Sequence, residues 1–332
     1  MANLKRILLP IAACGFSLLV GVVIGRNLAA KDALAKDPYL DSGLLRASDA
    51  RYQYINPLLA CNIAEQIEYR EFAPLEKKVQ DFIDQEISTH RVGQISVYFR
   101  DLEAARWMGV NENQEFIPAS LLKVQIMMAY FKRLESDPDF SAVKVFYENP
   151  ESPQAKDGFY TLKPGLYYTT EQLLRSMIVD SDNGAKDLLV NLIGENFLKE
   201  VFIDLGVKLP SAIRGDYGIS AKTYSLFFRI LYNATFLNKE QSDQALKLLT
   251  EVQFKNGLTA GVENGIPVAH KFGVYGDLQN SNTVELHDCG IVYAPTKPYF
   301  LCVMTKGGEV KVLQNAISSI SRIAYREVSN FK

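Results

Sequence analysis

Residues 116–131 read FIPASLLKVQIMMAYF, a stretch whose apolar residues fall on nearly every side of a helix. A helix without a polar stripe is usually surrounded by protein, so the pattern predicts a central helix over residues 119–134. Pro118 suits its first turn or the position just before it. Ser120 and Lys123 stand three residues apart and therefore share one helix face. A serine at a helix start is commonly a cap and a lysine commonly extends to water, so the pair alone indicates no function.

The composition bounds the kind of protein. The chain has 332 residues, 48% of them hydrophobic and 22% charged, with a formal net charge of −2. That length can bury a large core in one large domain or two small ones. The balanced charge, without a basic run, argues against nucleic acid as a partner. The sequence has no internal repeat and no low-complexity tract, and it leaves the oligomeric state open.

The N-terminal segment predicts membrane attachment. A cytoplasmic tail over residues 1–6 precedes a stretch without charge over residues 7–25. At about 1.5 Å per residue, this stretch spans the hydrocarbon of a bilayer as a transmembrane signal anchor. Lys5 and Arg6 favour a cytoplasmic N-terminus and hence an extracytoplasmic body, joined through an irregular stalk over residues 26–73. A cleaved signal, and so a secreted protein, is the alternative.

Residues 74–332 predict one α/β (α+β) domain. Strands occur at both ends of this region, with helices between them, which indicates a single antiparallel sheet. We expect the N- and C-terminal helices to cover one face and an all-helical lobe to cover the other, with any cleft where lobe and sheet meet. Besides the central helix, the predicted helices are 74–89, 170–179, 183–193, 196–204, 221–236, 239–253 and 310–328, and the predicted strands are 94–100, 105–110, 266–274, 285–294 and 299–306.

The four cysteines show no metal-binding spacing, so no metal site is predicted. Cys289 and Cys302 flank a turn near residues 295–298 and would face each other across a hairpin. We expect two reduced core cysteines, and a disulfide is the alternative in an exported protein. Lipidation at Cys14 or Cys61 is a weaker alternative, because neither follows an apolar run of suitable length.

Two further short motifs follow the Ser120-x-x-Lys123 pair. Residues 181–183 read Ser-Asp-Asn before a helical run, an ordinary helix entry by itself. Lys271 and Gly273 stand at the end of an apolar strand, which alone means little. In this order, however, S-x-x-K, S-D-N and K-x-G form the pattern of penicillin-recognising serine enzymes. From about residue 74 onward the chain resembles the class A β-lactamases and, more broadly, the penicillin-binding proteins.

The chemistry of such a site can be stated from the residue types. A serine hydroxyl is a poor nucleophile until a neighbouring base takes its proton. Lys123, one helical turn after Ser120, can do so when it is neutral, and burial near another cation such as Lys271 lowers a lysine pKa. The Ser120 N–H, at a helix N-terminus, can donate to the oxygen that becomes negative during attack.

The resemblance implies the remaining roles. The second donor to that oxygen would be the N–H of Val274, directly after Gly273. Ser181 would pass a proton to the leaving nitrogen, Asn183 would hold the substrate's amide, and Lys271 would attract a substrate carboxylate. The implied substrate is a small-molecule β-lactam or a D-alanyl stem peptide of peptidoglycan, and no cofactor is implied.

The sequence departs from the family pattern in two places. Phe272 stands where this family usually has Thr or Ser, and strand alternation predicts that it points away from the face of Lys271. The loop that normally supplies a deacylating glutamate corresponds to residues 205–215, which contain no Asp or Glu. Asp204 and Asp216 flank that stretch and are alternative bases.

Three functions therefore remain open. The first is a serine hydrolase that forms an acyl-enzyme at Ser120. The second is a D,D-carboxypeptidase or penicillin-binding protein that releases its acyl group slowly. The third keeps the fold for binding or sensing without catalysis, but such a protein would have no physical need for the intact set of polar motif residues.

Overall fold

The computed structural model describes residues 45–46, 51–60, 70–148, 159–207, 218–276 and 283–330. These residues belong to one compact unit, Leu44–Cys61 with Glu65–Lys332. None of the helices within them is long and apolar enough to cross a membrane. The predicted anchor at 7–25 and most of the loop at 205–215 lie outside the described residues.

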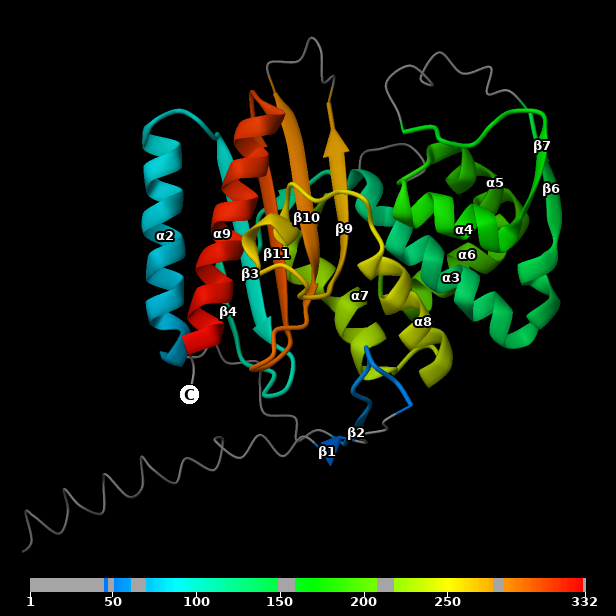
Figure 1. The fold of residues 1–332 in the computed structure, drawn as a ribbon, viewed down its shortest axis with the longest axis horizontal. Helices are drawn as coiled ribbons and strands as arrows, with labels where there is room; N and C mark the ends of the chain where they lie inside the picture. The colour runs from blue at the N-terminus through cyan, green and yellow to red at the C-terminus, as the bar shows by residue number, and fades with distance from the viewer. Residues whose placement is uncertain are drawn as a thin grey trace, which may run out of the picture. The chain divides into compact units, whose positions relative to one another are not determined.

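A five-stranded antiparallel sheet divides the body into two layers (Figure 1). Its strands lie in the order β4-β3-β11-β10-β9, so β9 is an edge strand. Within this sheet, β3 and β4 form the predicted hairpin, and β9, β10 and β11 are the predicted C-terminal strands. Their bounds are β3 Gln94–Asp101, β4 Trp107–Val110, β9 Val268–Tyr275, β10 Val284–Val292 and β11 Tyr299–Gly307.

The N- and C-terminal helices cover one face of the sheet, as predicted (Figure 1). They are α2, Ala73–Ser88, and α9, Val310–Asn330. In α2 the buried Leu75, Val79 and Ile83 recur at helical spacing, so they form one apolar stripe. This stripe belongs to a core cluster that α2 and α9 share with the sheet.

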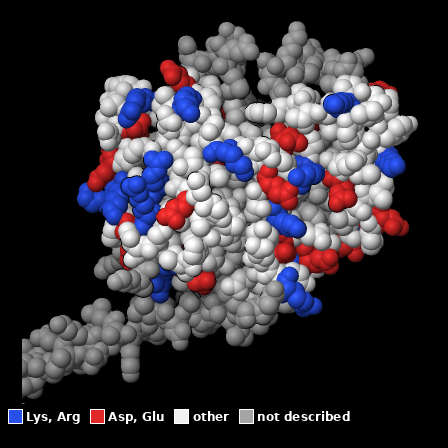
Figure 2. Space-filling view, viewed as in Figure 1, with Lys and Arg blue, Asp and Glu red and all other residues white. Residues whose placement is uncertain are grey.

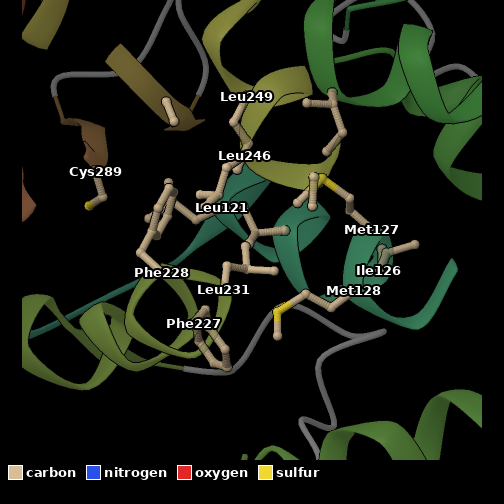
Figure 3. Packing of buried hydrophobic residues seen from close by; sticks show 14 of the residues in the cluster. Leu121, Ile126, Met127, Met128, Phe227, Phe228, Leu231, Leu246, Leu249 and Cys289 are labelled. Carbon is tan, nitrogen blue, oxygen red and sulfur yellow. The ribbon is translucent and has the colours of Figure 1, made fainter. Parts of the chain in front are cut away.

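A lobe of helices packs on the other face. Its members are α3 Lys123–Ser136, α4 Thr170–Val179, α5 Asn183–Ile193, α6 Glu195–Asp204, α7 Ala221–Asn233 and α8 Lys239–Thr250. Side chains of α3 such as Met127 and Met128 lie among Phe227 and Leu231 of α7 and Leu246 of α8 (Figure 3). The central helix is therefore enclosed by the lobe, as its unbroken apolar pattern predicted.

Short paired segments complete the described body. Three two-stranded sheets are present in the described ranges, β1 with β2, β5 with β8, and β6 with β7. Their bounds are β1 Leu45–Arg46, β2 Leu58–Ala60, β5 Glu115–Phe116, β6 Lys144–Tyr147, β7 Leu166–Thr169 and β8 Ile219–Ser220. Lys and Arg alternate with Asp and Glu across the face drawn in Figure 2, in line with the balanced charge of the sequence.

The start of the central helix differs from the prediction. Ala119–Leu122, called here the Ser120 turn, is a 3₁₀ turn, and the α-helix begins at Lys123. Ala119 has a φ of 48°, in the left-handed region that a residue inside a right-handed helix cannot adopt. Ser120 therefore lies on a tight turn just before the helix rather than in its first α-helical turn.

Part of the predicted stalk packs onto the body. Ile55 is buried in the core of the lobe. The Asn56 N–H donates to the Tyr232 carbonyl oxygen at 2.8 Å, and the Tyr54 N–H donates to Asp243 Oδ1 at 2.6 Å. The sequence predicted this stretch as an irregular stalk because it is charged and shows no periodicity. That prediction missed the few apolar residues, such as Ile55, that pack against the lobe.

The expectation of two reduced cysteines is wrong in this structure. Cys289 on β10 and Cys302 on β11 are directly opposite in the strand register and form a disulfide. The sequence placed them across a hairpin but did not give the register, which decides whether two cysteines meet.

We predict that buried side chains of the lobe core contribute strongly to stability. Ile178→Ala on α4 removes a fully buried side chain and should lower the free energy of unfolding by about 2–5 kcal/mol. Ile203→Ala on α6, where the side chain is 61% exposed, is the matched control and should change it by no more than about 0.5 kcal/mol. Denaturant unfolding of both variants checks this, and equal losses would contradict the packing described.

Candidate functional site

The segment before Ser120 is fixed by two side chains of β10. The Ile117 N–H donates to Glu285 Oε2 at 2.9 Å, and its carbonyl oxygen lies 3.0 Å from His287 Nε2. Because His287 Nδ1 accepts the Thr305 N–H, the proton of this imidazole is on Nε2 and is donated to Ile117. Both backbone polar groups of Ile117 are thus held by the sheet.

Glu285 is suited to this role because it stays ionised. Burial alone would raise its pKa, but hydrogen bonds from His287, the Ile117 N–H and Lys306 outweigh that effect and lower the pKa to about 2. The carboxylate is therefore charged throughout the neutral pH range. Sequence reasoning missed Glu285 because nothing near it in the chain identifies Ile117 as its partner.

Two further contacts fix the Ser120 turn, one with β9 and one with α7. A Cβ on Gly273 would lie 2.7 Å from the Pro118 carbonyl oxygen, so only glycine permits this approach. On the other side, Tyr224 of α7 donates from its hydroxyl to the Leu121 carbonyl oxygen at 3.0 Å. Val274, the expected oxyanion donor, follows Gly273 on this edge strand.

Lys123 points into the interior and connects two of the three motifs. Its ammonium donates to Asn183 Oδ1 at 2.7 Å and to Ser181 at both the carbonyl oxygen, at 2.5 Å, and Oγ, at 3.3 Å. Ser120 joins this group through the backbone, since its carbonyl oxygen accepts the Lys123 N–H. The structure therefore unites the S-x-x-K and S-D-N motifs.

The environment lowers the pKa of Lys123 to about 7. Burial is the largest cause, and the positive charge of Lys186 adds to it, while Asp182 and Asp187 act in the opposite direction. Near neutral pH a substantial fraction of this amine is uncharged and able to accept a proton. An ordinary lysine has almost none in that form.

Lys271 brings the third motif to the same serine. Lys271 belongs to β9, and its side chain is completely buried. Its ammonium donates to Ser181 Oγ at 2.8 Å. Burial, together with the nearby Lys123, moves its pKa well below the ordinary value, although Asp288 opposes the shift. Ser181 thus receives hydrogen bonds from both lysines.

The Ser181 backbone has a rare conformation directly before the residue that caps α5. Ser181 has a φ of 60°, which is unusual for a residue other than glycine. Asp182 caps α5 by accepting the Ala185 N–H at 2.7 Å, and its other oxygen accepts the Leu162 N–H at 3.0 Å and the Thr161 N–H. The predicted helix entry therefore also anchors the loop beside it.

The predicted orientation of Phe272 needs correction. Strand alternation places it opposite Lys271, yet its ring centroid lies 4.2 Å from Lys271 Nζ. The ring packs on Phe254 and Phe159. Because β9 is an edge strand, a side chain can bend around its free edge, which alternation does not take into account.

Histidines and acids outside the motifs serve other purposes. His270 Nδ1 lies 2.8 Å from Asp288 Oδ1, and Asp288 Oδ2 accepts the Leu258 N–H at 2.8 Å, so this buried pair joins the sheet to the segment before β9. Asp204 is exposed at the end of α6, and Asp216 lies outside the described residues. Within the described ranges, no group of acidic, His and Cys side chains is arranged to hold a metal ion.

Comparison with known proteins agrees with this architecture. The sequence profile described as the β-lactamase enzyme family matches residues 74–328, so the chain belongs to that family. It is a serine hydrolase of the β-lactamase type by fold and family. No curated protein matches this chain.

Solved structures share its fold at low sequence identity. PBP-A, solved as a mutant acyl-enzyme complex with penicillin G, has a TM-score of 0.65 and 20% identity over 81% of this chain and 100% of that chain. A β-lactamase from Chitinophaga pinensis has a TM-score of 0.65 and 20% identity, covering 76% and 99%. The TLA-3 extended-spectrum β-lactamase has a TM-score of 0.66 and 18% identity, also covering 76% and 99%.

We predict that Lys186 tunes the base. Lys186→Met removes a positive charge that lowers the pKa of Lys123, so that pKa should rise and less neutral amine should remain at pH 7. The acid limb of the pH profile for reaction with benzylpenicillin should move upward, with a rate about two- to threefold lower at pH 7. Lys186→Arg, which keeps the charge, is the matched control. An unchanged profile in Lys186→Met would refute this coupling.

We predict that Glu285 positions the Ser120 turn. Glu285→Ala frees the Ile117 N–H and should slow acylation by roughly 10–100-fold, whereas Glu285→Gln, which keeps an acceptor oxygen, should recover much of the loss. Because its pKa is about 2, the loss should be the same from pH 5 to pH 9 on an order-of-magnitude scale. Lys306→Met, which removes only an outer partner of Glu285, is the control. A loss that varies with pH, or equal losses in Ala and Gln, would argue against positioning.

Proposed function

We propose that the protein is a serine acyl-transfer hydrolase whose nucleophile is Ser120 and whose substrates are β-lactams or D-alanyl peptide amides. The observation that carries the proposal is the buried Lys123, whose pKa of about 7 and hydrogen bonds to Ser181 and Asn183 suit a general base one turn after a serine. Membership of the β-lactamase enzyme family supports it.

Acylation begins with proton transfer from Ser120 Oγ to the neutral amine of Lys123. The oxygen forms a bond to the carbonyl carbon of the substrate, and the carbonyl oxygen becomes negative. The N–H groups of Ser120 and Val274 stabilise that oxygen as paired donors. Gly273 supports this geometry because it lets the Ser120 turn lie directly against β9.

Collapse of the intermediate breaks the carbon–nitrogen bond. Ser181 Oγ gives its proton to the leaving nitrogen and receives one from Lys123, whose Nζ lies 3.3 Å away. The proton lost by Ser120 therefore ends on the leaving group, and Lys123 is neutral again. Lys271, 2.8 Å from Ser181 Oγ, holds that hydroxyl in place, while Asn183 receives the substrate's amide.

The rate at which the acyl group is released distinguishes a β-lactamase from a penicillin-binding protein or D,D-carboxypeptidase. A class A β-lactamase uses a loop glutamate for this step, and residues 205–215 contain none. The exposed Asp204 offers no buried site for activating a water. These observations favour slow deacylation, as in a penicillin-binding protein or D,D-carboxypeptidase, with Lys123 activating the acceptor.

We further propose an extracytoplasmic body attached to a membrane through residues 7–25. The paired Cys289 and Cys302 support this location, because disulfides form and persist outside the reducing cytoplasm.

Intact-protein mass spectrometry of the full chain mixed with benzylpenicillin tests the proposal. We expect an adduct of the mass of the penicillin that is absent in Ser120→Ala and unchanged in Ser88→Ala, which alters an exposed serine at the end of α2. Lys123→Met should slow its formation by roughly 10²–10⁴-fold.

The time course separates the alternatives. A persistent adduct indicates slow release, whereas an adduct that disappears as product accumulates indicates a β-lactamase. An adduct that survives Ser120→Ala would contradict the assignment of Ser120 as the nucleophile. Absence of both adduct and product in the wild-type chain, with benzylpenicillin and with its methyl ester, would favour a binding or sensing role.

A further inference from the structure

Three phenylalanines close the site beside Lys271. Phe272 stacks on Phe254 with ring centroids 4.4 Å apart, and Phe159 meets Phe272 edge-on at 5.6 Å. The Phe159 carbonyl oxygen also accepts the Asn183 N–H at 2.9 Å. The cluster therefore connects the edge strand β9 to the loop that places Asn183, across the position where a substrate's leaving group would lie next to Ser181.

The donors of Lys271 are already used within this cluster. Its ammonium donates to Ser181 Oγ at 2.8 Å and to the Phe272 carbonyl oxygen at 3.3 Å, and it faces the Phe272 ring at 4.2 Å. Two of the three N–H groups of the ammonium are therefore used by oxygen acceptors, and the ammonium also lies over an aromatic ring rather than open space. With 0% of its surface exposed, Lys271 offers no free donor to an incoming carboxylate.

The neighbouring strand supplies no other cation. β10, Val284–Val292, contains neither lysine nor arginine, and Asp288 is the register partner of Phe272. The imidazole N–H of His287 is donated to Ile117. A carboxylate placed beside Phe272 would therefore lose its hydration without gaining a hydrogen bond from a cation, which is strongly unfavourable.

We propose that Phe272 narrows the substrate class: among β-lactams and D-alanyl-type amides, the site prefers acyl donors whose leaving group carries an apolar, uncharged group in place of the usual carboxylate. The outer surface of the stacked Phe272 and Phe254 rings binds that group in the place that Phe159 now occupies, so Phe159 moves aside to admit it. This inference rests on the proposed acylation of Ser120 and specifies its substrate.

The test compares benzylpenicillin with its methyl ester, which differ only in this one group: a charged carboxylate in the first and an uncharged, less polar ester in the second. Second-order rate constants for adduct formation are measured with the full chain by intact mass, for both compounds at one pH. In the wild-type protein we expect the ester to react at least as fast as the acid. Phe272→Thr, which restores a hydroxyl and opens a path to Lys271, should raise the acid-to-ester rate ratio by tenfold or more.

Phe272→Leu is the matched control, because it keeps an apolar side chain and should leave the ratio within threefold of the wild-type value. Thermal unfolding of each variant verifies that it is folded, and the wild-type ratio alone tests the inference if Phe272→Thr does not fold. A wild-type preference of tenfold or more for the acid, or a ratio that folded Phe272→Thr leaves unchanged, would overturn the inference. Failure of both compounds to form an adduct would instead refute the acylation of Ser120, and with it the proposal that depends on it.

Discussion

The site depends on the cost of burying two lysines around one serine. Lys123 and Lys271 both donate to Ser181 Oγ, and both side chains are almost completely buried. Because burying a charge is costly, each lysine needs most of its hydrogen bonds made, and its pKa is lowered so that the neutral form is favoured. Ser181, which accepts from both lysines, adopts a left-handed conformation directly before the cap at Asp182. The same burial that makes the cluster costly makes Lys123 a base near neutral pH.

The nucleophile is placed by the sheet as much as by its own helix. A 3₁₀ turn is a weak local structure, and here it is fixed by Glu285 and His287 from β10 and by close contact with Gly273 on β9. The lobe contributes the opposing wall through Lys123 and Asn183. Since the sheet and the lobe each supply part of the site, their relative position decides whether a substrate fits, and the phenylalanine cluster joins them at that seam.

The sequence predicted the elements well and the contacts between them poorly. Apolar periodicity located α4 and α5, and three spaced motifs located the polar cluster, because both signals are local. The hydrogen bond between the Ile117 N–H and Glu285 joins residues 168 positions apart, and neither residue shows a sequence pattern that identifies the other. The disulfide and the closeness of the Phe272 ring to Lys271 likewise depend on strand register and edge position, which become known only once the sheet is assembled.

The most direct test of this account is the protonation state of Lys123 itself. In the full chain with ¹³C-labelled lysine, the Cε resonance that disappears in Lys123→Met should titrate with a midpoint of about 7. Such a result would show a lysine that is partly neutral at physiological pH beside Ser120. A Lys123 resonance that titrates only above about pH 10, like an ordinary lysine, would contradict the claim that burial prepares this residue as the base.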